Sequence, residues 1–190
     1  MILEVVKYGH PTLRQKGAQV EKITADIKAL IADMFDTMRA NKGVGLAAQQ
    51  VGHALQLTVL DVRNVTDRPS TLELAGKTAD VNAFMPLVLI NPEFQPVGDP
   101  VPATEGCLSF PELFAEISRP AGADIRALNE KGAKIHFRCG GLLARAIQHE
   151  LDHLNGVLFI DRMSRADKEE LKPQLDELQA KTKAALKARR

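Results

Sequence analysis

The spacing of apolar residues along the chain predicts an amphipathic helix near its start. In residues 24–40 they recur at three- and four-residue intervals and so gather on one helix face that can pack on a core. Thr24 starts this run and is a favourable N-cap residue. A second helix is predicted from about residue 142 to residue 154, because a Gly-Gly pair precedes it and an Asn-Gly pair follows it. The apolar face of the first helix consists of Ile27, Leu30, Ile31, Met34, Phe35 and Met38.

Short apolar runs bounded by turn-forming residues predict β-strands. The run at residues 87–90 is expected to stop at Asn91 and Pro92. The runs at residues 123–128 and 134–137 are expected to form a hairpin through residues 129–132. Residues 63–83 are rich in polar residues, and we expect an exposed loop or a loose hairpin there. The predicted strands cover residues 55–62, 87–90, 123–128 and 134–137.

A final helix is predicted to begin at Ser164, since Asp167 follows three residues later in the pattern of a capping box. Pro173 falls inside it, so a kink or two helical pieces are expected. The order of helix, strands, buried helix and terminal helix predicts an α+β fold, with antiparallel sheets around a central helix. We expect one catalytic domain over residues 1–190, with its C-terminal helix from about residue 164.

Composition narrows the class of protein. A length of 190 residues, 45% apolar and 26% charged, is typical of one soluble globular domain. The net charge of +1 gives no reason to expect DNA binding, and no stretch approaches the ~18 apolar residues of a membrane span. The N-terminus has no secretion-signal pattern, and the two cysteines make no disulfide framework. A reducing cytoplasm is therefore expected.

The most informative segment of the chain is H-E-L-D-H at residues 149–153. Residues four apart lie on one helix face, so His149 and His153 can both reach a single metal ion. Glu150 follows the first of them and can point at a metal-bound water without becoming a ligand. The pentapeptide alone is also compatible with an ordinary amphipathic helix whose charges are solvated.

A catalytic metal site needs a third protein ligand, and Cys107 is the best candidate. It stands in E-G-C-L-S, and the flanking Pro102 and Pro111 indicate a rigid, non-repetitive segment. The alternative is that Cys107 is a small buried apolar residue at a strand end. Cys139 competes for the role, but we interpret it as a structural, inert thiol.

The segment at residues 43–50, G-V-G-L-A-A-Q-Q, is the third candidate for chemistry. Its glycines and alanines allow a substrate or another backbone to approach closely. A glutamine amide can donate a hydrogen bond to a developing oxyanion. Taken alone, the segment is equally compatible with a structural turn.

Together the three segments resemble the motifs of peptide deformylases. Members of that family carry G-x-G-x-A-A-x-Q, E-G-C-x-S and H-E-x-D-H in this order, here at residues 43–50, 105–109 and 149–153. The flanking G-L-L-A and G-V-L-F segments also match, at residues 141–144 and 156–159. The resemblance extends from the region of Leu13 to the terminal helix.

The resemblance implies hydrolysis of the N-formyl group of N-formylmethionyl peptides, with release of formate. Cys107, His149 and His153 would bind one divalent metal ion, Fe²⁺ in the family's physiological form, with Zn²⁺, Ni²⁺ or Co²⁺ able to replace it. The ligands themselves do not favour iron, because a Cys-His-His set suits zinc as well. Glu150 would take a proton from the attacking water and later give it to the leaving amine.

The resemblance also implies roles for residues around the metal. The Gln50 side chain and the Leu108 backbone N–H would stabilise the oxyanion, and the Gly45 backbone would pair with the extended substrate, as in family members. Candidates for the wall of a methionine pocket are Val44, Leu142 and Ala146, although apolar residues on an inward face are also ordinary core residues.

Two features depart from the family pattern. Phe114 stands where several bacterial members have an arginine, so contacts with the substrate beyond methionine are expected to differ. Residues 63–83 are longer than in compact members, and we interpret them as a solvated insertion without a role rather than a wall of the cleft. Asp152 could orient a ligand histidine or be solvated, and Arg119 could pair with Glu105.

Other histidines and the basic C-terminus have simpler interpretations. His10, His53 and His136 lack ligand spacing and are interpreted as ordinary surface or core residues. The last ten residues contain five basic residues and no acid. In relatives the terminal helix can dock on the ribosome, so a contact with the ribosome surface is one expectation and a solvated helix end the other.

Alternative functions remain open from sequence. An H-E-x-x-H endopeptidase normally draws its third ligand from downstream of the helix, where this chain has no further histidine or cysteine. A metal-stapled binding module would need four protein ligands, with Cys139 as the fourth. A deformylase-like paralogue with an altered substrate is the third alternative.

Overall fold

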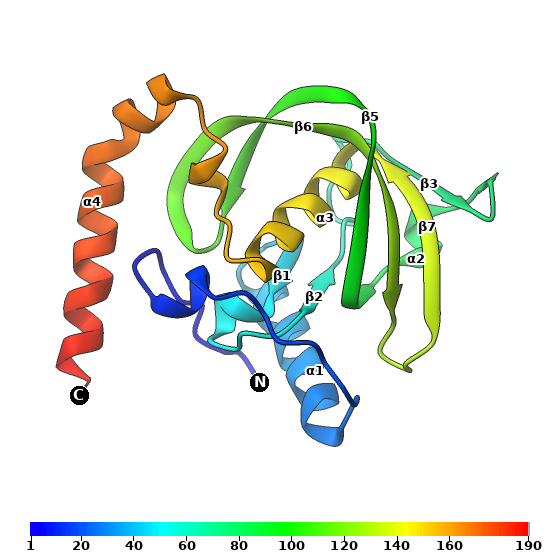
Figure 1. Ribbon diagram of the computed structural model, residues 1–190, viewed down its shortest axis with the longest axis horizontal. Coiled ribbons are helices and arrows are strands. Elements are labelled where there is room, and N and C mark those ends of the chain that lie inside the picture. Colours follow the sequence, from blue (N-terminus) through cyan, green and yellow to red (C-terminus); the bar gives the residue numbers. More distant parts are fainter. Residues whose placement is uncertain (190) are drawn as a thin grey trace.

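The computed structural model describes residues 1–189. Within this range the chain forms seven strands in one antiparallel sheet, of order β1-β2-β5-β6-β7-β3-β4, together with four α-helices. Figure 1 shows helix α3 running beneath the arch of the sheet, with α1 below it and α4 to one side. The α+β fold with a central helix is therefore confirmed. The bounds are β1 Gly45–Ala47, β2 Leu57–Leu60, β3 Ser70–Leu74, β4 Lys77–Thr78, β5 Leu87–Cys107, β6 Phe110–Leu128, β7 Lys134–Gly140, α1 Ala25–Ala40, α2 Val81–Phe84, α3 Gly141–Leu154 and α4 Arg165–Ala188, with short 3-10 helices η1 Pro11–Arg14, η2 Ala48–Val51 and η3 Phe159–Asp161.

The predicted first helix is α1, and its start is as expected. Thr24 Oγ1 accepts a hydrogen bond of 3.3 Å from the N–H of Ile27, which satisfies one free donor of the first turn. Its apolar face packs on β1 and β2, where Met34, Met38 and Leu46 are buried in one cluster. This packing fixes the start of the 43–50 segment, which forms β1 and η2 rather than an irregular loop.

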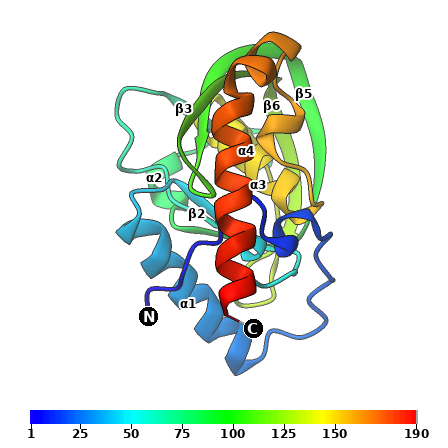
Figure 2. The same cartoon turned by 90° about the vertical axis from the view of Figure 1, so that its left-hand side faces the viewer.

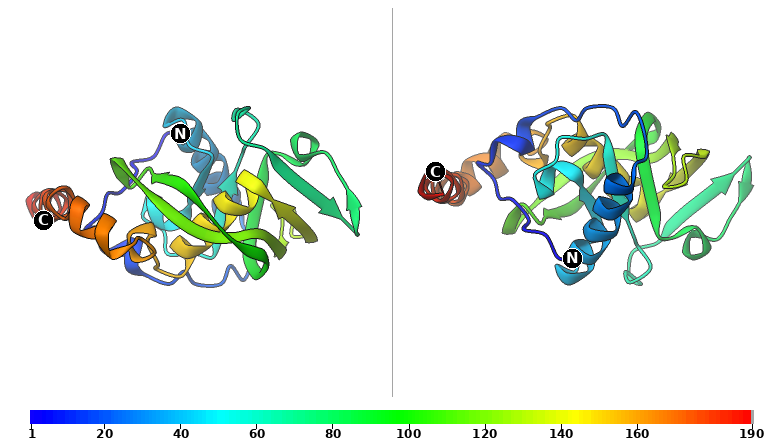
Figure 3. Two further views of the ribbon diagram at one scale, coloured as in Figure 1. Left: turned by 90° about the horizontal axis from the view of Figure 1, so that it is seen from above. Right: turned by 90° about the horizontal axis from the view of Figure 1, so that it is seen from below.

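The long hairpin of β5 and β6 corrects two predictions. Asn91 and Pro92 do not end the strand, which continues past a register irregularity to Cys107. The E-G-C-L-S segment is therefore the end of a strand and its turn, not a non-repetitive segment. Within residues 1–189, no strand pairs with the outer edge of β5 beyond Ile90. The prolines of β5, which lack an N–H donor, therefore break no ladder on that edge. Seen from above, the two strands cross over α3 (Figure 3).

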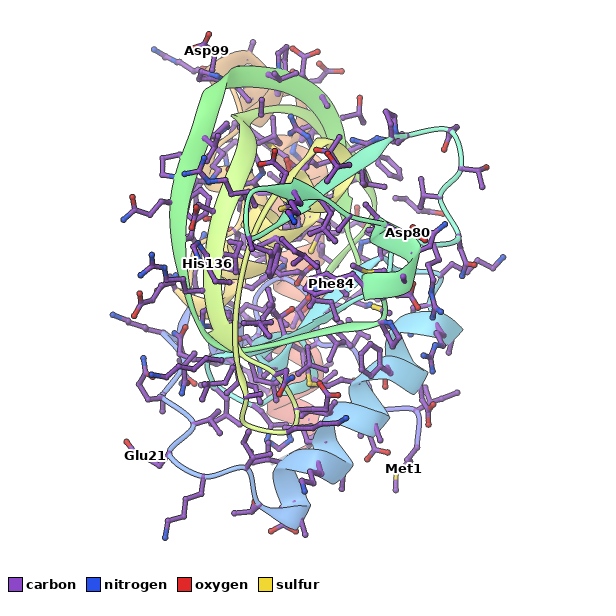
Figure 4. The ribbon with its side chains drawn as sticks, turned by 90° about the vertical axis from the view of Figure 1, so that its right-hand side faces the viewer. Met1, Glu21, Asp80, Phe84, Asp99 and His136 are labelled. Atoms are coloured by element: carbon purple, nitrogen blue, oxygen red, sulfur yellow. The ribbon has the colours of Figure 1, made fainter. Side chains whose placement is uncertain are left out.

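Within residues 63–83, strands β3 and β4 form a hairpin that belongs to the sheet. Strand β3 pairs with β7, and Leu72 is buried in the same core cluster as the central helix. Phe84 on α2 packs edge-on against Phe137, with ring centroids 5.1 Å apart; Figure 4 shows this face of the molecule. The hairpin alternative is confirmed, whereas the interpretation as a solvated insertion is wrong, because side chains from this segment complete the core.

The terminal helix α4 begins as predicted, with Ser164 Oγ accepting a hydrogen bond of 3.1 Å from the N–H of Asp167. It is one helix that contains Pro173, so of the two expected alternatives the two separate pieces are wrong and the kink remains. Its axis changes direction near its start, as Figures 1 and 2 show. Leu175 is buried against Phe110 and Phe159, and this packing holds the helix in place despite the proline. Within residues 1–189 no helix combines the length and apolarity of a membrane span.

Candidate active site

Helix α3 carries the two histidines into the centre of the molecule. Twelve of its fourteen residues are buried, because the sheet covers it on several sides. Gly140 and Gly141 start the helix, and Gly141 has a φ of +65° that favours glycine. His149 and His153 therefore lie on a rigid, dehydrated element, with their ring centroids 5.1 Å apart.

Cys107, the last residue of β5, meets these histidines. The ligand atoms of Cys107, His149 and His153 all lie within 4.8 Å of one another, and Cys107 Sγ is 3.4 Å from His153 Nε2. A thiolate and an imidazole bound to one tetrahedral metal ion should lie about 3.6 Å apart. The three predicted ligands are thus brought together with the spacing of a metal site. Within the described residues Cys139 is not part of this group.

Glu105 orients the first histidine. Its Oε1 lies 2.9 Å from His149 Nδ1, which leaves Nε2 as the ring nitrogen free to bind a metal. Arg119 holds Glu105 through contacts of 2.7, 3.0 and 3.1 Å, so the predicted pairing of these two residues is confirmed. Arg145 adds a further contact of 3.0 Å to the same carboxylate.

Asp152 does not orient a ligand histidine, and that prediction is wrong. Its carboxylate instead binds Arg119 at 2.8 Å and Arg162 at 2.6 and 2.7 Å. It thereby supports the arginine that holds Glu105. The sequence did contain a signal for the true partner, since Glu105 and Cys107 are two residues apart on one strand and so share a face.

The charges around the site favour a cation between Cys107 and His149. Burial opposes a charge on His149, but its contacts with the Cys107 thiol and Glu105 raise its pKa well above the ordinary value. Burial also opposes the negative charge of Glu105, yet contacts with His149 and Arg119 lower its pKa to about 2. Burial lowers the pKa of His153. A neutral second imidazole beside a site that attracts positive charge fits a bound metal ion.

Glu150 is buried beside the ligands. Burial raises its pKa to about 7, against the opposing influence of His149 and Arg119. Within the described residues its Oε2 has no hydrogen-bond partner. A carboxylate with a pKa near neutrality can both accept and return a proton, as a general base requires.

Gln50 and Leu108 lie on either side of the thiol. Gln50 Oε1 accepts a hydrogen bond of 2.9 Å from the N–H of Ala47, and this turns its Nε2 toward Cys107 Sγ, 3.6 Å away. Gln50 Nε2 also donates to Ser109 Oγ at 3.3 Å. Leu108 follows Cys107 in the β5–β6 turn, and its carbonyl accepts a hydrogen bond of 2.8 Å from Lys7 Nζ. The two predicted oxyanion donors thus lie near Cys107 on separate elements, Gln50 on η2 and Leu108 in the β5–β6 turn.

A cavity of about 600 Å³ opens onto these residues. Its walls include each predicted site residue except the fully buried His153: Val44, Gly45, Gln50, Cys107, Leu108, Phe114, Leu142, Ala146, His149 and Glu150. Leu142 and Ala146 also belong to the main core cluster, so they pack in the core and line the cavity as well.

Gly45 makes room for the Glu150 carboxylate. A Cβ atom at this position would lie 2.6 Å from Glu150 Oε1 and 2.9 Å from its Cδ. Gly45 also lies in β1, one of the two edge strands of the sheet, which pairs on one side with β2. Gly45 therefore leaves space for Glu150 and also forms part of a sheet edge beside the cavity.

Comparison with known proteins decides the family. The model of the polypeptide deformylase family matches residues 2–169. This chain belongs to that family. It is 43% identical over 178 residues to the peptide deformylase of Methylacidiphilum infernorum, with 94% of this chain and 93% of the relative covered. The peptide deformylase of Opitutus terrae is also 43% identical, with 98% of each chain covered.

Solved structures of peptide deformylases share the fold. Peptide deformylase 1B of Arabidopsis thaliana in complex with an inhibitor gives a TM-score of 0.82 at 35% identity, covering 96% of this chain and 93% of that one. The Legionella pneumophila enzyme gives 0.78 at 31% identity, covering 100% and 99%. The chain is accordingly an enzyme of the deformylase family with a candidate Cys-His-His metal site. The endopeptidase alternative finds no support.

The remaining thiol and histidines take ordinary places in this deformylase. Cys139 is buried in the core, where burial raises the pKa of its thiol to about 12. His10 Nδ1 accepts a hydrogen bond from the N–H of Thr12, and His136 pairs with Asp124 at 2.8 Å on the surface. Sequence reasoning missed Lys7 and Arg68 on the cavity wall, since nothing local connects either residue with the three motifs.

Proposed function

We propose that this deformylase removes the formyl group from the N-terminal formylmethionine of newly made polypeptides and releases formate. One observation carries the proposal: Gln50, Cys107, His149 and Glu150, which come from the three family motifs, line one cavity. Residues 1–190 would act as a single catalytic domain in the cytoplasm.

Cys107, His149 and His153 would hold one divalent metal ion, and Fe²⁺ is the ion we propose, with Zn²⁺, Ni²⁺ or Co²⁺ able to replace it. Their thiolate and imidazole donors fit such ions better than Mg²⁺ or Ca²⁺, which prefer oxygen ligands. The bound ion would supply Lewis acidity that lowers the pKa of a water molecule. Glu105 would keep His149 in the tautomer whose Nε2 faces the metal.

Glu150 would move the proton during hydrolysis. Its buried carboxylate has no partner for Oε2 among residues 1–189 and can accept a hydrogen bond from the attacking water. After attack on the formyl carbon, Glu150 would return the proton to the leaving amine of methionine. The pKa of about 7 suits both transfers.

Gln50 Nε2 and the Leu108 backbone N–H would stabilise the negative charge that develops on the formyl oxygen. The hydrogen bond from Ala47 to Gln50 Oε1 fixes the amide, so no reorganisation is needed when the charge appears. The Lys7 contact with the Leu108 carbonyl would hold the turn that carries the second donor.

The substrate would lie along β1 with its methionine side chain in the cavity. The Gly45 backbone belongs to an outer strand, which can pair with an extended peptide by strand addition. Val44, Leu142 and Ala146 would form the apolar wall for methionine. Phe114 would contact residues beyond it.

The terminal helix would bring the enzyme to nascent chains by binding the ribosome surface. Lys181, Lys183 and Lys187 give its last turns an excess of positive charge, while Arg189 pairs with Glu4 at 2.9 Å. Its apolar face packs on the rest of the molecule through Leu175, so the charged face points outward.

The test is formate release from a short N-formylmethionyl peptide by protein purified without oxygen and loaded with Fe²⁺. Rapid release is expected, together with its loss in a Glu150→Ala variant that still holds the metal. The specificity control is an acetylated analogue of the same peptide, because the formylated peptide should be the substrate. Absence of release by the fully loaded wild type would refute the proposal.

A further inference from the structure

The segment before β3 is fastened to the start of the metal-binding helix. The N–H of Leu142 donates to the Pro69 carbonyl at 3.0 Å, and the N–H of Leu143 donates to Ser70 Oγ at 3.0 Å. The first turn of α3 thus receives its capping acceptors from residues 69 and 70 rather than from its own N-cap. A Cβ atom at Gly141 would lie 2.1 Å from the Pro69 oxygen, so the two backbones are in closest contact here.

Arg68 precedes this attachment and lines the mouth of the active-site cavity. Its side chain is exposed, and among residues 1–189 it makes no ion pair. Arg63, on the same segment, is different: it pairs with Asp61 at 2.6 Å and does not line the cavity. Because residues 69 and 70 are fixed, the Arg68 backbone is held at the cavity mouth with its guanidinium available to a ligand.

Phe114 lies on the cavity wall contributed by β6. Its side chain is 63% exposed, an unusual state for a large apolar residue. The ring rests over Gly106, where a Cβ atom would lie 2.7 Å from one ring carbon. The mouth therefore presents a fixed aromatic surface together with an arginine.

We propose that Arg68 and Phe114 form a subsite for the residues that follow formylmethionine, and that this subsite favours acidic side chains. This inference rests on the proposed deformylase function. A guanidinium can bind a carboxylate through two hydrogen bonds, while the ring covers the aliphatic part of the same side chain.

Other charges at the mouth agree with this preference. Lys42 is exposed on the cavity wall, and Lys7 lies half-buried deeper in it. Glu112 is the only exposed acid on the wall within the described residues. Cations thus outnumber anions where the peptide leaves the cavity, and a basic residue of the substrate would be repelled.

The test compares kcat/KM for N-formyl-Met peptides that carry Glu or Lys at the first, second or third position after methionine. For an ion pair open to water we expect the wild type to prefer Glu by about two- to fivefold at one of these positions. Arg68→Glu should reverse the preference, Arg68→Gln should abolish it, and salt should weaken it in the wild type.

Arg126→Glu is the matched control for Arg68→Glu. Arg126 is exposed and lies outside the cavity, and its substitution changes the net charge by the same amount. It should keep the wild-type preference. Equal rates for Glu and Lys peptides in the wild type, or an unchanged preference in Arg68→Gln, would overturn the inference. Failure of the proposed function looks different, because the wild type would then release no formate from any of the peptides.

Discussion

The close contact between Gly45 and Glu150 gives a sharp prediction about catalysis. In Gly45→Ala the new Cβ would lie 2.6 Å from Glu150 Oε1, whereas ordinary contacts begin at 3.4 Å. The φ of Gly45 lies outside the left-handed region, so the backbone itself accepts alanine. The carboxylate, which is buried, must therefore move by roughly 0.8 Å to relieve the overlap.

A displacement of about 1 Å at a reacting group can cost about 10²-fold in rate. We therefore expect kcat of Gly45→Ala to fall by about 30- to 100-fold, a loss of about 2 to 3 kcal/mol in transition-state stabilisation. The metal content should stay unchanged, because the three atoms nearest to the new Cβ all belong to Glu150 and none to Cys107 or a histidine. The assay is steady-state formate release, with metal content measured on the same samples.

Gly43→Ala is the matched control. Its new Cβ would meet the end of the Leu108 side chain at 2.9 Å, and a flexible side chain can give way. This variant should lose less than about fivefold in kcat, because a rotamer adjustment costs about 1 kcal/mol. Wild-type kcat in a fully metal-loaded Gly45→Ala would refute the placement of Glu150 beside β1.

Three further predictions concern the groups around the metal. Gln50→Ala should lower kcat by about 10²–10³-fold with the metal still bound, because one oxyanion donor is lost; wild-type kcat would exclude that role. Lys7→Met should lower kcat about three- to tenfold, because the 2.8 Å hydrogen bond from Lys7 Nζ to the Leu108 carbonyl is lost. Lys7→Arg should be less affected, and steady-state assays of kcat and KM measure both variants. Glu105 has a folded-state pKa of about 2, below its ordinary 4.5, so its contribution to stability is present above pH 4.5 and is lost as the pH falls through about 2. The measurement is urea unfolding of chelator-treated protein over this pH range. Between pH 4.5 and 2 the wild type should lose roughly 3 kcal/mol more unfolding free energy than Glu105→Gln, and an identical pH dependence in both proteins would contradict the assignment.

Local pattern was sufficient to predict the main helices and the three candidate metal ligands that the structure brings together. The stripe of α1 and the i, i+4 spacing of His149 and His153 depend on helix geometry alone, which repeats every few residues. Cys107 was found because its motif, like the other two, can be recognised as a string of adjacent residues. The capping residues Thr24 and Ser164 were predictable for the same reason, since a cap acts within one turn.

Long-range pairing decided the rest. The full lengths of β5 and β6 follow from their pairing with each other, which overrides the local signals of Asn91 and Pro92. Packing on a core likewise keeps α4 a single helix through Pro173. Neither effect can be read from a short window of sequence, because the partner residues are distant in the chain.

The surroundings of the candidate metal ligands show most clearly which features local sequence predicts and which depend on the tertiary structure. Sequence determined that a thiol, two imidazoles and a carboxylate exist at the right local spacings. Only the tertiary structure decided that Glu105 rather than Asp152 holds His149, and that Arg68 lies at the cavity mouth. A hydrogen bond between side chains depends on where whole strands and helices come to rest, and that position is set by the sum of many contacts rather than by any one segment.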